Sequence, residues 1–277
     1  MKVIGKITRR LMSYGHRAKL LLGTTRHLRN GRELRRLAKR ASQGEAMIGR
    51  PVLHFKNGLR ITMVPGSHEG WDFLFREIFL DKCYQPTPDF IPRQGWTVVD
   101  LGANMGFFTC QTAFSNPDVR VVAVEPLPLY AEALKNNIKD NHLANARAIE
   151  GAICGNPGLT IPITVWFTAA GELKTGEVPR TAARTETINA RGWTLPEVFS
   201  AGKVERCDLL KVDIEGAEYD LFEKIPAELW QKIQRIVMEV HNSTAHSETE
   251  IVQVLERNGF KVHLKPEGVT SLLWAAR

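Results

Sequence analysis

The sequence has few of the features that assign a chain to a class at once. Cysteines are scarce: the 277 residues contain four, and no two of them form a C-x-x-C pair. Such spacing indicates neither a disulfide framework nor a thiolate metal site. It fits a reducing environment best, and we expect a cytoplasmic protein.

Long apolar runs are also missing. The longest uncharged stretch, residues 101–117, contains two glycines and three amide side chains, whereas a membrane-spanning helix needs roughly 20 apolar residues. A secretory signal needs an apolar run of about 7 to 15 residues near the start, and no run there is longer than residues 20–22. The sequence therefore predicts neither a transmembrane helix nor export.

Basic charge is concentrated at the N-terminus. The whole chain carries a net charge of +7, yet residues 1–50 hold fourteen basic and two acidic side chains, so the remainder is net negative. On a helical wheel, the apolar side chains of residues 3–22 fall on one side and Lys2, Lys6, Arg9 and Arg17 on the other. This pattern favours contact of residues 1–40 with an anionic membrane surface, at the inner face of the membrane, or with a polyanion. A solvated arm and a mitochondrial targeting sequence are the alternatives.

Between this arm, residues 1–50, and the main domain we expect a short lead-in, residues 51–96. Two apolar runs around Asn57-Gly58 predict a β-hairpin, and residues 71–80 are apolar at helical spacing. The prolines that follow cannot continue that helix and mark the boundary with the next domain. His68 or Asp72, in the turn before the helix, is a candidate lid over a cofactor, with a simple helix N-cap region as the alternative.

Residues 97–277 are predicted to form one α/β domain. Short runs rich in Val, Ile and Leu alternate with helical patterns, which is typical of a parallel sheet covered by helices on both faces. We expect strands at residues 97–101, 119–125, 146–153, 209–214, 236–240, 260–264 and 271–275, and helices after Gly106, over 129–141, from Glu218 and over 251–258. Residues 155–206 are expected to be irregular and to recognise an acceptor, apart from one helix that a capping box at Thr194 and Glu197 begins.

The strongest local signal is an apolar strand, an acid, two glycines four apart and a helix: Val98-Val99-Asp100-Leu101-Gly102-Ala103-Asn104-Met105-Gly106-Phe107-Phe108-Thr109. The glycines allow a tight turn and the close approach of a ligand, and the helix N-terminus offers unpaired N–H groups. The dinucleotide fingerprint has its middle glycine where Asn104 stands. Asp100 would repel a pyrophosphate but attract the cationic S-adenosylmethionine. The predicted cofactor-binding residues here are Asp100, Gly102, Ala103, Asn104, Gly106, Phe107 and Thr109.

A second acid supports the same ligand. Glu125 ends the next predicted strand, 25 residues after Asp100, and Pro126 follows it. A carboxylate at this strand end can accept hydrogen bonds from both hydroxyls of a ribose. We therefore predict that Glu125 and Pro126 contact the cofactor, with Asp72 reaching over it from the lead-in.

These motifs resemble those of class I S-adenosylmethionine-dependent methyltransferases and, more narrowly, the FkbM family. The resemblance covers about residues 97–241 and depends on the glycine turn, on Val124-Glu125-Pro126, on Asp208-Leu209-Leu210-Lys211-Val212-Asp213-Ile214-Glu215-Gly216-Ala217-Glu218 and on Glu239-Val240-His241. Pro196 departs from it, since an aspartate is expected there. The resemblance implies a Rossmann-like, seven-stranded, mostly parallel sheet with its last strand antiparallel. It also implies methyl transfer from S-adenosylmethionine, usually to a hydroxyl of a sugar or a polyketide-like molecule.

Candidate catalytic residues follow two strands of this domain. Asp213 and Glu215 end the fourth strand and Glu239 and His241 the fifth, so all four are expected at the carboxyl edge of the sheet. Methylation of a hydroxyl needs a group that removes its proton. We predict His241 or Asp213 as that base, with Glu215 and Glu239 orienting the acceptor. A helix-dipole role is preferred for Glu218, and Lys211 is expected to pair with a neighbouring acid.

The predicted function is S-adenosylmethionine-dependent O-methylation of a carbohydrate or another hydroxylated metabolite. A divalent metal ion held by Asp213, Glu215, His241 and Asn242 is an alternative that we do not favour, so no metal ligand is assigned. A nucleic-acid partner is not favoured, because the domain is net negative and lacks an Asn/Asp-Pro-Pro-aromatic run. A membrane-associated binding module without catalysis is the third alternative. The sequence leaves the oligomeric state open.

Overall fold

The computed structural model describes residues 18–43, 45, 49–68, 70–167, 173–174, 178–241, 246–266 and 270–277. Most of the predicted amphipathic helix, residues 3–17, and Asn242 of the alternative metal site lie outside these ranges. Among the described residues, no helix has both the length and the apolar character that crossing a membrane requires.

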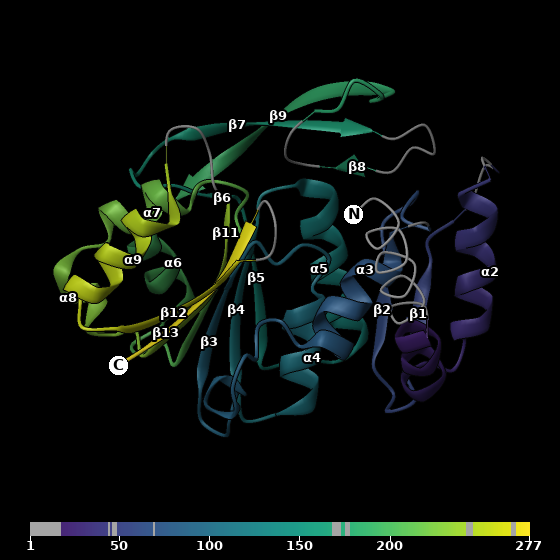
Figure 1. The fold of residues 1–277 in the computed structure, drawn as a ribbon, viewed down its shortest axis with the longest axis horizontal. Coiled ribbons are helices and arrows are strands. Elements are labelled where there is room, and N and C mark those ends of the chain that lie inside the picture. The colour runs from purple at the N-terminus through teal and green to yellow at the C-terminus, as the bar shows by residue number, and fades with distance from the viewer. Residues whose placement is uncertain are drawn as a thin grey trace, which may run out of the picture.

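A seven-stranded sheet forms the centre of the described chain, in the order β12-β13-β11-β10-β3-β4-β5 (Figure 1). The parallel strands are β3 (Thr97–Leu101), β4 (Arg120–Glu125), β5 (Ala146–Glu150), β10 (Leu209–Val212) and β11 (Arg235–His241). Strand β13 (Thr270–Ala276) runs antiparallel between β11 and β12 (Lys261–Pro266). The predicted mostly parallel sheet with an antiparallel last strand is confirmed.

Alternate residues of the central strands face opposite helical layers. Val98 and Val121 belong to one buried cluster, which side chains of α4 (Phe107–Ser115) and α5 (Pro128–Asp140) complete. Val99 and Val122 belong to another, completed by α6 (Leu195–Gly202), α7 (Glu218–Lys224), α8 (Ala227–Trp230) and α9 (Glu248–Arg257). Successive side chains of a strand point to opposite faces. The near-continuous apolar strands are therefore buried on both sides, as the sequence predicted.

The lead-in packs beside α5 and supplies one wall of the site described below. Strands β1 (Val52–His54) and β2 (Arg60–Thr62) form the predicted antiparallel hairpin. The predicted helix over residues 71–80 is also present, as α3 (Trp71–Phe75) continued by a π-helical segment (Arg76–Asp81). A short 3₁₀ turn, Pro88–Phe90, lies in the proline-rich stretch.

Two helical segments of the basic N-terminal region lie against this hairpin. Residues 18–27 are helical and are followed by α2 (Gly31–Ala41). Leu28 forms a β-bridge with Phe55, and Leu28 and Leu34 are buried in the same cluster as Leu53. This part of the arm is therefore packed on the protein rather than extended into solvent.

The expectation that residues 155–206 are irregular is wrong. Strands β6 (Ala152–Ile153), β7 (Thr160–Phe167), β8 (Leu173–Lys174) and β9 (Arg184–Trp193) form a second sheet in the order β6-β9-β7-β8. It lies across the upper end of the main sheet in Figure 1. Most of β9 is exposed and polar, so it lacks the apolar alternation that predicts a strand. The capping box of Thr194 and Glu197 at the start of α6 is confirmed.

Candidate functional site

The loop after β3 contains backbone conformations with positive φ, which few residue types adopt. Gly102 has a φ of 77°, and a Cβ atom there would lie 1.7 Å from the carbonyl oxygen of Asp213. Asn104 also has a positive φ, 52°, and its Oδ1 accepts a hydrogen bond from the N–H of Met105 at 2.7 Å. Asparagine tolerates this left-handed conformation better than most residues. The loop can therefore pass close to β10 and lead directly into α4.

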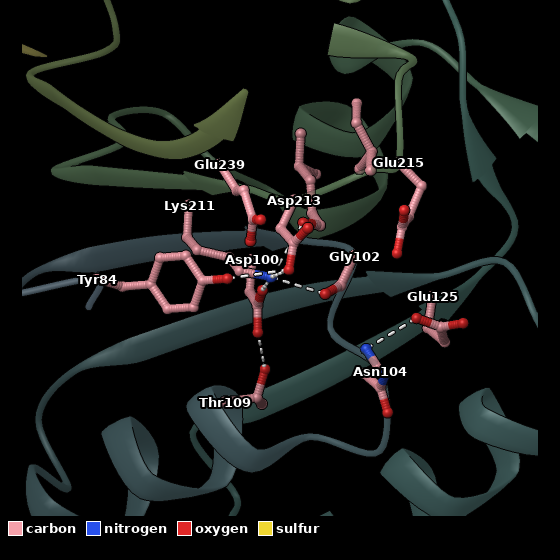
Figure 2. A network of polar contacts seen from close by, with 12 residues as sticks. Tyr84, Asp100, Gly102, Asn104, Thr109, Glu125, Lys211, Asp213, Glu215 and Glu239 are labelled. Carbon is pink, nitrogen blue, oxygen red and sulfur yellow. Dashed lines mark hydrogen bonds and ion pairs between the residues drawn. The ribbon is translucent and has the colours of Figure 1, made fainter. Parts of the chain in front are cut away.

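Glu125, at the end of β4, fastens this loop. One carboxylate oxygen accepts the N–H of Asn104 at 2.8 Å (Figure 2). The other accepts the N–H of Leu127 at 3.0 Å. Burial raises the pKa of Glu125 to about 7, although these two hydrogen bonds oppose the shift. Its carboxyl group therefore changes charge near neutral pH, at the wall of a cavity that it lines together with the glycine loop.

A cavity of about 540 Å³ opens where the two strand ends and the glycine loop meet. That volume lies within the range of roughly 300 to 1,000 Å³ of small-molecule pockets. Six predicted cofactor residues line it: Gly102, Ala103, Asn104, Phe107, Glu125 and Pro126. Ile161 and Ile163 of the unexpected strand β7 close another side. The cavity thus has the size, the glycine turn and the buried acid that a nucleoside-bearing cofactor requires.

The other predicted cofactor residues do not line this cavity. Gly106 is instead the N-cap residue of α4, where a Cβ atom would lie 2.6 Å from a methyl carbon of Leu134. Asp72 lies half-buried in the first turn of α3, and His68 is buried before it. The lead-in reaches the cavity through Leu74, Glu77, Ile78 and Tyr84 instead. A lead-in wall over the cavity is therefore present, but other side chains than those predicted form it.

Asp100 lies beneath the glycine loop rather than at the cavity wall. Its side chain is completely buried, and its Oδ2 accepts a hydrogen bond from the hydroxyl of Thr109 at 2.6 Å. Its Oδ1 lies 3.1 Å from Nζ of Lys211. In this structure, Asp100 and Thr109 therefore do not make the direct contact with a ligand that the sequence predicted. The physical reason is the register of the sheet, which pairs Asp100 with Lys211 on the neighbouring strand.

Lys211 is the buried ion-pair partner that the sequence predicted. Its Nζ also donates to the carbonyl oxygen of Gly102 at 2.7 Å and lies 3.8 Å from Oδ2 of Asp213. Burial alone lowers the pKa of Lys211, but the charges of Asp100 and Asp213 outweigh it and raise the pKa above its usual value. One ammonium group therefore connects a strand-end acid, the glycine loop and an acid of the cavity wall, as Figure 2 shows.

The four predicted catalytic residues come together at the carboxyl edge of the sheet. Nε2 of His241 lies 3.6 Å from a carboxylate oxygen of Glu215 and 4.0 Å from one of Glu239. Asp213, Glu239 and His241 each place a potential ligand atom within 4.8 Å of the others. Asp213 and Glu215 line the 540 Å³ cavity, whereas Glu239 lines a second cavity of about 690 Å³. The carboxylates at this edge therefore belong to the walls of two cavities.

Glu218 has a larger role than the helix-dipole interpretation allowed. Its side chain is fully buried, and one carboxylate oxygen lies 2.9 Å from Nδ1 of His241. The other oxygen has no hydrogen-bond partner among the described residues. Burial lowers the pKa of His241, but Glu218, Asp213 and Glu215 together raise it to about 9. The dipole interpretation was incomplete because it could not place Glu218 behind an imidazole 23 residues away.

Two further residues of the site, Tyr84 and Glu77, were not predicted from the sequence. The hydroxyl of Tyr84 donates to Oδ2 of Asp213 at 2.9 Å. Glu77 lines both cavities, and burial together with the charges of Asp213 and Glu239 raises its pKa to about 7. A charged residue inside the apolar segment 71–80 was the available signal for Glu77. Nothing in the sequence near Tyr84 marks it.

A seven-stranded sheet with this strand order, a glycine loop after its first strand and an acid after its second define a class I S-adenosylmethionine-dependent methyltransferase. The chain belongs to the family of the methyltransferase FkbM domain, whose family model matches residues 100–262. It is therefore an S-adenosylmethionine-dependent methyltransferase enzyme.

Two relatives illustrate the similarity to known methyltransferases. The methyltransferase sdnD of Sordaria araneosa is 27% identical over 221 residues, which cover 69% of this chain and 82% of that protein. The 31-O-demethyl-FK506 methyltransferase FkbM of Streptomyces tacrolimicus is 27% identical over 239 residues, which cover 76% of this chain and 89% of that protein.

Similarity to solved structures is weaker. A precorrin-6y C5,15-methyltransferase from Geobacter metallireducens is similar with a TM-score of 0.43 and 12% identity, over 71% of this chain and 84% of that one. An O-methyltransferase family protein from Burkholderia thailandensis has a TM-score of 0.41 and 12% identity, over 76% of this chain and 60% of that one.

Proposed function

We propose that this enzyme transfers a methyl group from S-adenosylmethionine to a hydroxyl of a carbohydrate or another hydroxylated metabolite. The observation that carries the proposal is the gathering of Asp213, Glu215, Glu239 and His241 beside the donor cavity. Carboxylates accept hydrogen bonds from hydroxyl groups and can take up a proton, and an imidazole does the same in its neutral form. The relative from Streptomyces tacrolimicus, whose name describes an O-demethyl compound as substrate, supports an oxygen acceptor.

For the donor, we assign the ribose hydroxyls to Glu125. Its carboxylate lies at the cavity wall and already binds the N–H of Asn104, so the sugar and the glycine loop would share one acid. Asp100 contributes indirectly: it pairs with Lys211, which donates a hydrogen bond to the carbonyl oxygen of Gly102. In this assignment Gly102, Ala103, Asn104, Phe107 and Pro126 surround the ligand, and Asp100, Gly106 and Thr109 hold the loop in shape.

For the acceptor, we place the hydroxyl that is methylated against the carboxylates at the carboxyl edge of the sheet. Bound S-adenosylmethionine supplies an electrophilic methyl group, and the chain must hold the hydroxyl in line with it and remove a proton. Asp213 and His241 are the candidate bases, and His241, whose pKa is raised to about 9, can act as one only after it has lost its own proton. Glu215 and Glu239, on either side of the imidazole, orient the acceptor through hydrogen bonds.

The membrane contact of residues 1–40 stays a proposal of its own. Along α2, Leu34 faces the protein while Arg32, Arg36, Lys39 and Arg40 are exposed. Exposed basic side chains beside a packed apolar face suit an anionic surface at the inner side of the cytoplasmic membrane. Co-sedimentation with phosphatidylglycerol vesicles, compared with phosphatidylcholine vesicles, tests this contact independently of methylation.

The central experiment is calorimetry of S-adenosylhomocysteine binding to the full chain. The wild type is expected to bind, and Glu125→Ala to lose at least about tenfold in affinity, since one charged hydrogen-bond acceptor contributes roughly 1.5 to 3 kcal/mol. Glu132→Ala, an exposed acid on α5, serves as the control. A wild type that does not bind, or a Glu125→Ala variant with unchanged affinity, would contradict the donor assignment.

The acceptor class is tested separately. Purified enzyme is incubated with S-adenosylmethionine and matched acceptors that carry a hydroxyl, an amine or a thiol on the same sugar skeleton, and formation of S-adenosylhomocysteine is measured. The proposal expects turnover of the hydroxyl compounds, with a methyl ether as product by mass spectrometry. Preference for the amine or the thiol would refute it.

A further inference from the structure

Three metal-ligating groups converge at one point of the sheet edge. Strands β10 and β11 are parallel neighbours, with Val212 opposite Met238, so Asp213 follows β10 next to Glu239. Glu239 and His241 are two residues apart on β11 and therefore share one face. Asp213, Glu239 and His241 place one ligand atom each within 4.8 Å of the others.

An independent observation concerns the far side of the imidazole. Nδ1 of His241 lies 2.9 Å from the fully buried carboxylate of Glu218, which leaves Nε2 to face Glu239 and Glu215. Metal-ligating histidines commonly bind a carboxylate through their second ring nitrogen, which fixes the orientation of the ring. The second oxygen of Glu218 is buried without a hydrogen-bond partner among the described residues. A buried carboxylate of this kind is stabilised by positive charge on the imidazole, which either a proton or a metal ion at Nε2 supplies.

The charges of the region leave a place for such a cation. Four carboxylates, those of Asp213, Glu215, Glu218 and Glu239, surround His241 or flank it. Of the ammonium groups near this edge, that of Lys211 lies closer to the buried Asp100 (3.1 Å) than to Asp213 (3.8 Å), and Lys265 lines the second cavity together with Glu239. Negative charge is therefore in excess at the edge itself.

We infer that Asp213, Glu239 and His241 bind one divalent cation at the carboxyl edge of the sheet. This set differs from the alternative drawn from the sequence, because Glu239 takes the place of Glu215 and Asn242 is not required. Two carboxylates and one imidazole suit Mn²⁺, since carboxylates favour Mg²⁺ and Mn²⁺ while imidazole favours transition metals. Three protein ligands leave coordination positions open to small oxygen ligands.

The role of the cation rests on the proposed O-methylation, whereas its binding does not. Asp213 belongs to the wall of the donor cavity and Glu239 to that of the second cavity, so the cation would lie between them. A divalent ion at such a place orients a hydroxyl and lowers its pKa. His241 would then be a ligand rather than the base, and Glu218 would be a positioning residue that acts through it.

The test measures Mn²⁺ binding to the chelator-treated full chain, by the electron paramagnetic resonance signal of free Mn²⁺ and by calorimetry. The wild type is expected to bind one Mn²⁺ per chain, and Glu239→Gln and His241→Ala each to weaken binding at least about tenfold. Glu218→Gln keeps a hydrogen-bond acceptor but removes the charge, and a loss of about 10-fold is expected, as for other residues behind a metal ligand. His246→Ala is the matched control, because His246 also contacts a carboxylate, Glu250 at 2.9 Å, but is exposed.

Two outcomes would overturn the inference: no Mn²⁺ binding by the wild type, or equal affinity in the wild type and Glu239→Gln. Glu239 does not line the donor cavity, so S-adenosylhomocysteine binding by Glu239→Gln checks that the variant is folded. Binding of S-adenosylhomocysteine also distinguishes failure of the donor assignment from failure of the cation site. Mn²⁺ binding without S-adenosylhomocysteine binding would refute the donor assignment alone, and the reverse would refute the cation site alone.

Discussion

Lys211 and Asp100 form an ion pair of 3.1 Å between two neighbouring strands, with 4% and 0% of their side chains exposed. Removing one partner of a buried pair leaves an uncompensated charge and costs about 3 to 5 kcal/mol. We therefore expect Lys211→Met to lower the free energy of unfolding by that amount in urea denaturation. The charge-neutral pair Lys211→Met with Asp100→Asn is expected to recover part of the loss, since Thr109 can still donate to the amide oxygen.

Lys135 provides the control for this prediction. Its Nζ lies 2.6 Å from Glu150, but both side chains are nearly half exposed. An exposed pair contributes about 1 kcal/mol or less, so Lys135→Met should hardly change stability. Equal effects of Lys211→Met and Lys135→Met would show that burial of the Lys211–Asp100 pair is not what matters.

Glu125 makes donor binding depend on pH. Its pKa of about 7 in the folded protein lies above the ordinary value of 4.5, so the free protein retains a proton between these values and loses stability as pH rises through them. If the ribose hydroxyls donate to the ionised carboxylate, binding requires that this proton leave. We expect S-adenosylhomocysteine to bind roughly tenfold more weakly at pH 6 than at pH 8 in calorimetry.

A second acid of the cavity controls for this effect. The pKa of Glu77 is also raised to about 7, so Glu77→Gln is expected to retain the pH dependence and Glu125→Gln to lose it. The opposite result would assign the titration to Glu77.

The predictable parts of the structure share one property: their signal is local. The strand from Val98, the glycine turn and Glu125 were predicted because strand burial and turn chemistry depend on neighbouring residues. The sheet of β7 and β9 was missed because its exposed, polar strand β9 is defined by pairing with β7. The placement of Asp100 depended equally on a distant residue, since only the register with β10 brings Lys211 beside it.

The same distinction applies to the acidic edge. Strand ends predicted that Asp213, Glu215, Glu239 and His241 meet, and they do. Glu218 behind His241, and Tyr84 on Asp213, join residues 23 and 129 positions apart. No spacing rule predicts such pairs, because tertiary packing creates them.

Asn104 occupies a backbone conformation that separates two substitutions. With a φ of 52°, a β-branched residue there is strained by about 1 to 3 kcal/mol, whereas glycine is not. Asn104→Gly is expected to stay within about threefold of the wild-type affinity for S-adenosylhomocysteine, with Asn104→Val weaker by about tenfold or more, measured by calorimetry. Equal affinities of the two variants would mean that the loop conformation is not what the ligand requires.

Gly102 and Gly158 allow backbone strain and steric clash to be told apart. Both have a positive φ, 77° and 75°, so alanine at either position bears a similar conformational cost of about 1 to 2 kcal/mol. A Cβ atom at Gly158 meets nothing within 4 Å, whereas one at Gly102 would lie 1.7 Å from the carbonyl oxygen of Asp213. Because backbone must move there, we expect Gly102→Ala to lower the free energy of unfolding by at least about 3 kcal/mol, the upper end for overpacking. It should also abolish binding of S-adenosylhomocysteine, while Gly158→Ala keeps it. Denaturation and calorimetry on the pair decide the matter: if Gly102→Ala resembles Gly158→Ala in both, the close passage of the loop against Asp213 does not shape the donor cavity.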